Sequence, residues 1–167
     1  MLSIGQYDWI SEAKPEDVIQ LALAAAPKSV QSVRFAARCG YIRTFQPKAQ
    51  KQWKRAIKVA VSEQLPVGWQ PFGKVPLWVQ VVYVFPPLKS AKKAELEIID
   101  SGGVIYKETR PDVNDNLNKG LFDALTGVLW EDDGRVVSSH VYKVFGKETG
   151  ILISAGVLPK GLRKVEL

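Results

Sequence analysis

The chain has 167 residues, 46% of them hydrophobic, and a formal net charge of +6 at pH 7. This length and composition suit one domain with an ordinary buried core. The single cysteine, Cys39, excludes a disulfide framework, and with the single histidine, His140, it excludes the usual Cys/His zinc sites. The calculated pI of about 9.4 favours a polyanionic partner, although net charge does not separate DNA, RNA and anionic lipid.

The first 32 residues are expected to form a helical appendage. Residues 12–26 are predicted to be a helix because Pro15 suits the first turn, the acidic Glu16 and Asp17 suit the positive end, and Pro27 ends it. No signal-peptide pattern is present, and no apolar run nearby is long enough to span a bilayer. We therefore expect a soluble, cytoplasmic protein without a membrane partner.

Apolar patterns predict the elements that follow. Residues 33–45 alternate as a strand does, with a turn at Gly40, and residues 77–85 form a nearly continuous apolar run, typical of a strand buried on both faces. Residues 47–64 repeat apolar side chains at i, i+3, i+4, i+7 and i+8, as a helix with one core-facing stripe does. Residues 88–107 look like a basic insertion, which would suit a mobile flap over DNA.

The other side of the predicted helix 47–64 is basic, with no acidic residue until Glu63. Like charges along one face repel one another unless a bound polyanion neutralises them. We expect this face to follow a phosphate backbone, with an ordinary solvated face as the alternative. Its basic residues are Lys48, Lys51, Lys54, Arg55 and Lys58.

The stretch after the insertion is acidic. Between Glu108 and Asp133 it holds seven acidic residues and only two basic ones. Pro111 favours the first turn of a helix and Gly127 favours a helix end, with apolar residues at helical spacing between them. Clustered carboxylates repel one another unless a cation or hydrogen bonds hold them, so a bound divalent metal is the first candidate.

Three polar residues of this helix, Asp112, Asp115 and Lys119, share one side at i, i+3 and i+7. Asp132 and Asp133 follow after a tight connection, and a short return path could bring them to the helix start. Carboxylates with one lysine suit Mg²⁺, which takes oxygen ligands and keeps several waters. Two plainer interpretations stay open: a loose helix capping box formed by Asp112 and Asp115, and a turn at residues 132–134.

The remaining chain predicts two strands and a tail. Residues 135–145 and 150–155 are strands, and the glycine-containing loop between them has the length of a hairpin connection. Residues 159–167 form a basic tail that is expected to be frayed. The order of elements predicts an α+β fold, a single domain with a mixed β-sheet covered by helices.

The combined motifs of this chain closely resemble the RusA family of Holliday-junction resolvases, which is found in bacteria and their phages. The shared pattern is Asp-x-x-Asp-Asn-x-x-Lys, then Asp-Ala-Leu-x-Gly, Trp-x-Asp-Asp and Val-Val, and it lies here between Arg110 and Lys143. A weaker likeness covers residues 33–87. The resemblance implies a RusA-like nuclease domain over residues 33–158, of phage or prophage type, in the cytoplasm of a bacterial host.

The activity that the resemblance implies is that of a homodimeric endonuclease. It would use Mg²⁺, with Mn²⁺ as the other suitable ion, and cut four-way DNA junctions by paired nicks in recombination and repair. Two other functions share these motifs: a non-catalytic nucleic-acid binding protein on a RusA-like scaffold, and a nuclease of flaps or forks.

The resemblance also implies roles for single residues. The family's catalytic and metal-binding carboxylates map onto Asp112, Asp115 and Asp133, and its essential lysine maps onto Lys119. Asp132 would be a further metal ligand or would orient one. Lys143 coincides with a basic residue of the family and would touch phosphate or be a surface lysine. Helical spacing, separately from the resemblance, puts Asp115 and Asp123 each one turn from Lys119, so they could hold its ammonium. Asn116 would orient a ligand by hydrogen bonding.

One departure from the family pattern concerns the first two aspartates. The family usually separates them by one residue, whereas Val113 and Asn114 both lie between Asp112 and Asp115 here. Either Asp112 reaches the metal through a one-residue bulge, or Asn114 or water replaces the first ligand. The altered spacing is the feature that favours a non-catalytic protein.

Overall fold

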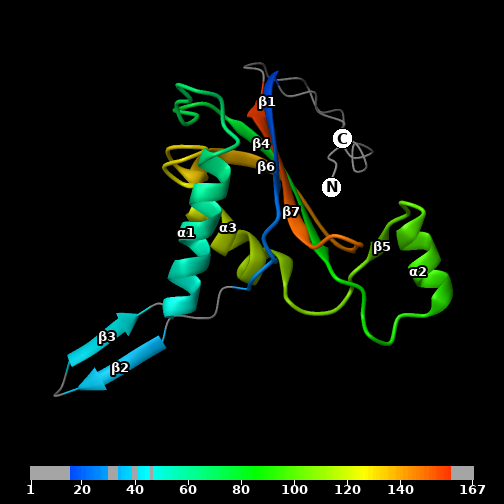
Figure 1. The fold of residues 1–167 in the computed structure, drawn as a ribbon. Helices are drawn as coiled ribbons and strands as arrows, with labels where there is room; N and C mark the ends of the chain where they lie inside the picture. The colour runs from blue at the N-terminus through cyan, green and yellow to red at the C-terminus, as the bar shows by residue number, and fades with distance from the viewer. Residues whose placement is uncertain (1–15, 30–33, 39–40, 46, 159–167) are drawn as a thin grey trace, which may run out of the picture.

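The computed structural model of this chain describes residues 16–29, 34–38, 41–45 and 47–158. A five-stranded sheet with the order β1-β7-β4-β6-β5 lies at its centre, and a separate pair joins β2 to β3 (Figure 1). β6 runs parallel to β4, and the other neighbours are antiparallel. The α+β prediction with a mixed sheet is therefore confirmed. The strands are β1 (Glu16–Leu23), β2 (Arg34–Arg38), β3 (Tyr41–Phe45), β4 (Leu77–Phe85), β5 (Ile105–Tyr106), β6 (Val136–Phe145) and β7 (Gly150–Val157).

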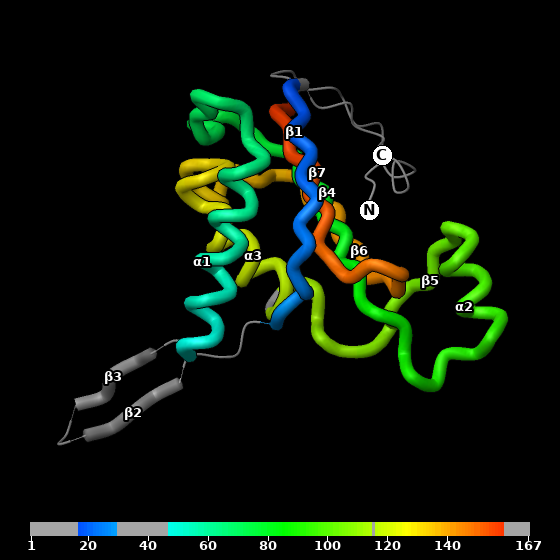
Figure 2. Tube along the Cα trace, in the orientation of Figure 1, coloured from blue at the N-terminus to red at the C-terminus, as the bar shows by residue number. Residues whose placement is uncertain are grey.

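The helices lie in two places. α1 and α3 cover one face of the sheet, whereas α2 lies away from them beside β5 (Figure 2). Both predicted long helices are confirmed, although the acidic one opens with a π-helical turn. The helices are α1 (Lys48–Ser62), α2 (Lys93–Asp100), the π turn η2 (Val113–Asn118), which continues directly into α3 (Lys119–Leu125), and the short 3₁₀ turn η3 (Asp133–Arg135).

Strand β4 is buried on both faces, as its continuous apolar sequence predicts. On one face Val79 and Val81 belong to the core cluster that includes Ile57 of α1 and Leu121 of α3. On the other face Val82 and its neighbours pack with side chains of β6 and β7. The central strand therefore carries two apolar layers, and the layer under α1 and α3 is the larger one.

The helix predicted at residues 12–26 is wrong, because residues 16–23 form strand β1 at an edge of the main sheet. β1 pairs with β7, and its side chains alternate: Leu21 and Leu23 are buried while Gln20 is exposed. This period of two places the large side chains of Leu21 and Leu23 on the buried side of the strand. A register shift follows Glu16, as a β-bulge does.

The hairpin predicted between residues 135–145 and 150–155 is also wrong, although both strands exist. β6 and β7 lie on opposite sides of β4 and do not pair with each other. Their connection crosses the end of β4, where the N–H of Gly146 donates to the carbonyl of Phe85 at 2.9 Å. Loop length and glycine content therefore predicted a short connection correctly. They did not predict that β4 would lie between the two strands that this connection joins.

Substitution of Leu21 tests the strand assignment. Leu21→Ala removes a side chain that is 1% exposed, and we expect the free energy of unfolding to fall by about 2–5 kcal/mol. Gln20→Ala, at the exposed neighbour, is the matched control and should change it by less than about 0.5 kcal/mol. Chemical denaturation measures both; equal losses at the two positions would contradict alternating burial.

Candidate functional site

The acidic helix begins with a wide turn. The N–H of Leu117 donates to the carbonyl of Asp112, and the N–H of Lys119 donates to that of Asn114, so each bond spans five residues. Such a π turn accommodates one residue more than an α-helical turn. It includes Val113 and Asn114, the two residues that separate Asp112 from Asp115. Asp112 occupies the N-cap position in extended backbone, but its side chain makes no capping bond, so the capping-box interpretation is not supported.

The carboxylate of Asp112 is exposed and oriented. Its Oδ2 accepts a hydrogen bond from Nδ2 of Asn116 at 3.3 Å, and the residue is exposed to solvent. Asp115 belongs to the backbone of η2, but its side chain lies outside the described part of the structure. Asp112 is therefore the one carboxylate at the start of this helix whose side chain the structure describes.

Asp132 and Asp133 follow the C-terminal end of this helix, after a turn in which the N–H of Gly127 donates to the carbonyl of Trp130 at 2.7 Å. Trp130, just before them, contacts the Phe122 ring at 5.3 Å, and its Nε1 donates to Thr126 Oγ1 at the C-terminal end of α3. The helix from Val113 to Leu125 rises about 18 Å between its ends. Among the described residues no three His, Cys, Asp or Glu side chains come together as metal ligands.

The turn interpretation of residues 132–134 fits the structure. Asp132 Oδ1 accepts a hydrogen bond from the N–H of Gly134 at 2.9 Å, and η3 follows. The preceding segment is fixed by the loop after α1, because the N–H of Glu131 donates to the carbonyl of Phe72. The carboxylate of Asp133 is left exposed at the surface.

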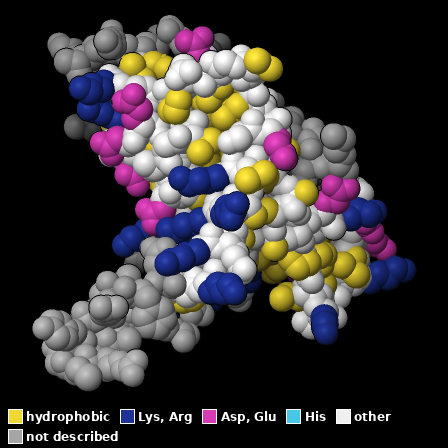
Figure 3. Space-filling view, turned by 60° about the vertical axis from the view of Figure 1, so that its left-hand side comes forward, with side chains coloured by type: hydrophobic (Ala, Val, Ile, Leu, Met, Phe, Trp, Pro, Cys, Tyr) yellow, Lys and Arg dark blue, Asp and Glu magenta, His cyan; other side chains and the backbone are white. Residues whose placement is uncertain are grey.

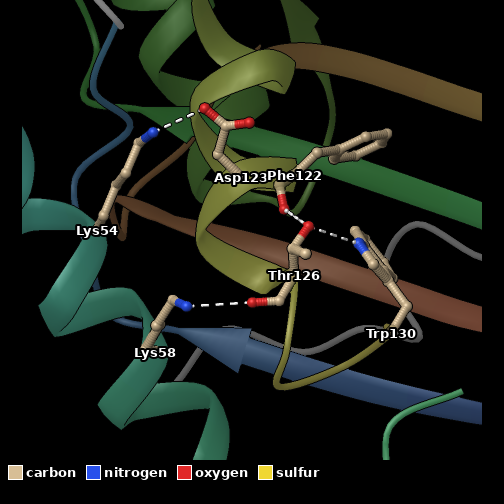
Figure 4. Close-up of polar contacts among 6 residues, drawn as sticks. All are labelled: Lys54, Lys58, Phe122, Asp123, Thr126 and Trp130. Carbon is tan, nitrogen blue, oxygen red and sulfur yellow. Dashed lines mark hydrogen bonds and ion pairs between the residues drawn. The ribbon is translucent and has the colours of Figure 1, made fainter. Parts of the chain in front are cut away.

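Two lysines of α1 bind the acidic helix (Figure 4). Nζ of Lys54 lies 2.7 Å from Oδ2 of Asp123, and Nζ of Lys58 donates to the carbonyl of Thr126 at 3.1 Å. Thr126 is the C-cap of α3, where a cation also meets the negative end of the helix dipole. Asp123 therefore pairs with Lys54 and not with Lys119, and two of the predicted DNA-binding lysines join helices.

The other basic residues of this face point to solvent. Lys48, Lys51 and Arg55 of α1 are exposed, and so is Lys119 at the start of α3, which makes no ion pair with a described carboxylate. Figure 3 shows basic side chains gathered on this side of the molecule with few acidic ones among them. We refer to Lys48, Lys51, Arg55 and Lys119 as the basic face.

Two lysines hold the segment that leads into Asp112. Nζ of Lys143 donates to the carbonyls of Thr109 and Pro111, both at 2.8 Å. Nζ of Lys107 donates to the hydroxyl of Thr109 and lies 5.3 Å from the ring centroids of Phe85 and Phe145. Burial, with the nearby positive charge of Lys143, lowers the pKa of Lys107. The sequence predicted no role for Lys107.

A buried hydrogen bond ties the helix to the sheet. The hydroxyl of Tyr83 donates to Oδ1 of Asn118 at 3.0 Å, and burial raises the pKa of Tyr83 well above its ordinary value. No pattern in the sequence predicted this pair. A polar residue at Asn118, within the buried helical face of Leu121 and Leu125, is the signal that could have indicated it, because buried polar groups need partners.

The sequence comparisons agree with this fold. Residues 25–155 match the family described as "Endodeoxyribonuclease RusA". This match places the protein among the endodeoxyribonucleases, enzymes that cut DNA. Within that class the chain belongs to the RusA family, so the resemblance is confirmed. The chain is also similar to the uncharacterized protein YqaN of Bacillus subtilis (strain 168): 29% identical over 132 residues, 79% of this chain and 91% of YqaN. Among the described helices, none is long and apolar enough to cross a membrane.

A double-mutant cycle tests the link between α1 and α3. Lys54 and Asp123 form a partly buried pair, with exposed fractions of 14% and 40%. We expect Lys54→Met and Asp123→Asn to show a coupling free energy of about 0.5–1 kcal/mol in urea unfolding at low salt. The same cycle with Lys51, which is exposed, in place of Lys54 is the control; equal coupling in both cycles would contradict a specific pair.

Proposed function

We propose that this protein is a Mg²⁺-dependent endonuclease that resolves four-way DNA junctions by paired nicks and works as a homodimer. The observation that carries the proposal is the joining of a basic helix to the acidic helix of a RusA-family fold. A surface for phosphate and a carboxylate at the helix start are thereby held in one rigid unit.

The donor chemistry at the helix start suits a hard divalent cation. Asp112 offers an exposed carboxylate oriented by Asn116, and oxygen donors of this kind are the ligands of Mg²⁺. Asp115, in the same turn, is proposed as the second ligand. The wide turn of η2 gives Asp112 the bulged path that its altered spacing requires, which supports Asp112 over Asn114 as the ligand. When bound, Mg²⁺ stabilises charge on the scissile phosphate and lowers the pKa of a coordinated water.

The third carboxylate needs a second protomer. Within one chain, Asp133 lies just before β6 begins at Val136, whereas Asp112 follows Pro111, whose carbonyl is held by Lys143 near the other end of β6. Positions seven residues apart on a strand are separated by about 23 Å, much farther than two ligands of one ion can be. A twofold axis that places Asp133 of one protomer beside Asp112 of the other would create two identical sites, and paired nicks require two sites related by such symmetry. We therefore propose that Asp133 of the partner subunit completes each site, with Asp132 as its orienting neighbour.

Basic residues position the DNA. Lys119 carries an exposed ammonium where η2 continues into α3, and it would offset negative charge on the phosphate as the bond breaks. Lys51 and Arg55 extend the positive surface along α1 and would contact the phosphates on either side. Lys54 and Lys58 would act indirectly, because their ammonium groups are already bound.

Neutralising the aspartates tests catalysis. Asp112→Asn, Asp115→Asn and Asp133→Asn should each abolish cleavage of a synthetic four-way junction, while junction binding stays equal or tightens because negative charge facing phosphate is removed. Junction, fork and linear duplex are compared side by side in Mg²⁺ and in EDTA. Wild-type cleavage in EDTA, or full cleavage by the Asp115 and Asp133 variants in Mg²⁺, would refute the assignment.

Mixed dimers distinguish a site completed by Asp133 of the partner subunit from a site in which one chain supplies every ligand. One protomer with Asp112→Asn and a partner with Asp133→Asn leave one intact site if ligands come from both chains, and none if each chain supplies its own. We expect mixed dimers to nick one strand of a cruciform plasmid, whereas either variant alone leaves it uncut. Verified mixed dimers that nick nothing would contradict the shared site.

Salt dependence tests the basic face. Each phosphate contact adds about 0.9 to the slope of log affinity against log salt concentration, so neutralising Lys51 and Arg55 together should lower the slope by about 2. Fluorescence anisotropy with a labelled junction in EDTA measures it. Replacement of Lys74, an exposed lysine of the loop after α1, is a single-charge control outside the basic face and should leave the slope unchanged. An unchanged slope in the double variant would show that α1 faces water.

A further inference from the structure

Lys143 is fixed by the protein at two of its three ammonium donors. It belongs to β6, its side chain is half-buried, and Nζ donates to the carbonyls of Thr109 and Pro111 at 2.8 Å each. An ammonium has three donors and no acceptor, so one donor at most is left for another group. A lysine held in this way is poorly placed to follow a DNA phosphate.

The backbone of the same residue binds the same segment. The carbonyl of Lys143 accepts a hydrogen bond from the N–H of Lys107 at 2.8 Å. Together with the two bonds to Nζ, three hydrogen bonds join residue 143 to residues 107–111. Lys107 adds a fourth restraint through the hydroxyl of Thr109, and the rings of Phe85 and Phe145 flank its ammonium.

The restrained segment ends next to the proposed metal ligand. Pro111, whose carbonyl Lys143 holds, directly precedes Asp112. On the other side, the carbonyl of Asp112 accepts from the N–H of Leu117 in the π turn. The backbone of Asp112 is therefore fixed from β6 before it and from the helix after it, in an extended conformation that the helix alone would not impose.

We propose that Lys143 is a positioning residue for the metal centre: its ammonium holds the carbonyls of Thr109 and Pro111 and thereby places the Asp112 carboxylate. The inference rests on the proposed function, because it takes Asp112 as a metal ligand. It replaces the expectation that Lys143 contacts phosphate. Loss of the ammonium would leave two carbonyls without their donor and give Asp112 more freedom, which weakens metal binding more than DNA binding.

The test compares Lys143→Met and Lys143→Arg with Lys74→Met, which removes the same charge from an exposed loop position. In Lys143→Met the Mg²⁺ concentration for half-maximal junction cleavage should rise about tenfold, with the maximal rate recovered to within a few-fold at saturating Mg²⁺. The salt slope of junction binding in EDTA should equal that of wild type. Lys143→Arg should fall between, and Lys74→Met should match wild type in Mg²⁺ requirement.

Two results would overturn the proposal. A slope lowered by about 1 with an unchanged Mg²⁺ requirement would make Lys143 a phosphate contact. Unchanged amide hydrogen exchange at residues 110–113 in Lys143→Met would show that the ammonium restrains nothing, whereas faster exchange there and not in β4 supports the proposal. The exchange experiment needs no activity, so it separates this proposal from the proposed function; if Lys143→Met does not fold, Lys143→Arg carries both measurements.

Discussion

Burial of β4 on both faces is the constraint on which the rest of the structure depends. A central strand needs a neighbour on each side, and β6 lies parallel to it while β7 lies antiparallel. A parallel neighbour cannot follow through a tight turn, so the chain must cross from one end of the sheet to the other between β4 and β6. The whole acidic stretch lies in that crossover, which explains why the candidate site is built from connections and not from the sheet.

The crossover is held from three directions. The sheet supplies Tyr83 to the middle of the helix and Lys143 to the segment before it, and α1 supplies Lys54 to the helix surface. Each contact joins residues that are far apart in sequence, so the helix cannot shift without breaking a polar contact. A rigid frame of this kind suits a reaction in which small displacements of a ligand reduce the rate strongly.

Periodicity predicted most of the fold because most elements bury one regular face. α1 and the acidic helix follow from apolar residues at helical spacing, and β4 follows from its continuous apolar run. β1 does not follow in this way, because its short alternation overlaps a helical signal bounded by prolines. The strand neighbours of β7 depend on long-range pairing that no local pattern encodes. At the site, residue types indicated Asp112 and its orienting partner Asn116, but the π turn and the opposite placement of Asp133 arise only from tertiary packing.

The position of β1 at an edge of the main sheet determines where the chain can be truncated without loss of structure. The family match begins at residue 25, just after this strand ends at Leu23, so a truncation at that boundary would remove an outer strand of the main sheet. The hydrogen-bonding groups of β7 would then face water beside Ile151 and Ile153, which are fully buried in the intact chain. Unpaired strand edges of this type form hydrogen bonds with strands of other molecules. A fragment that begins at residue 25 would therefore be prone to aggregation, although the intact chain is well packed.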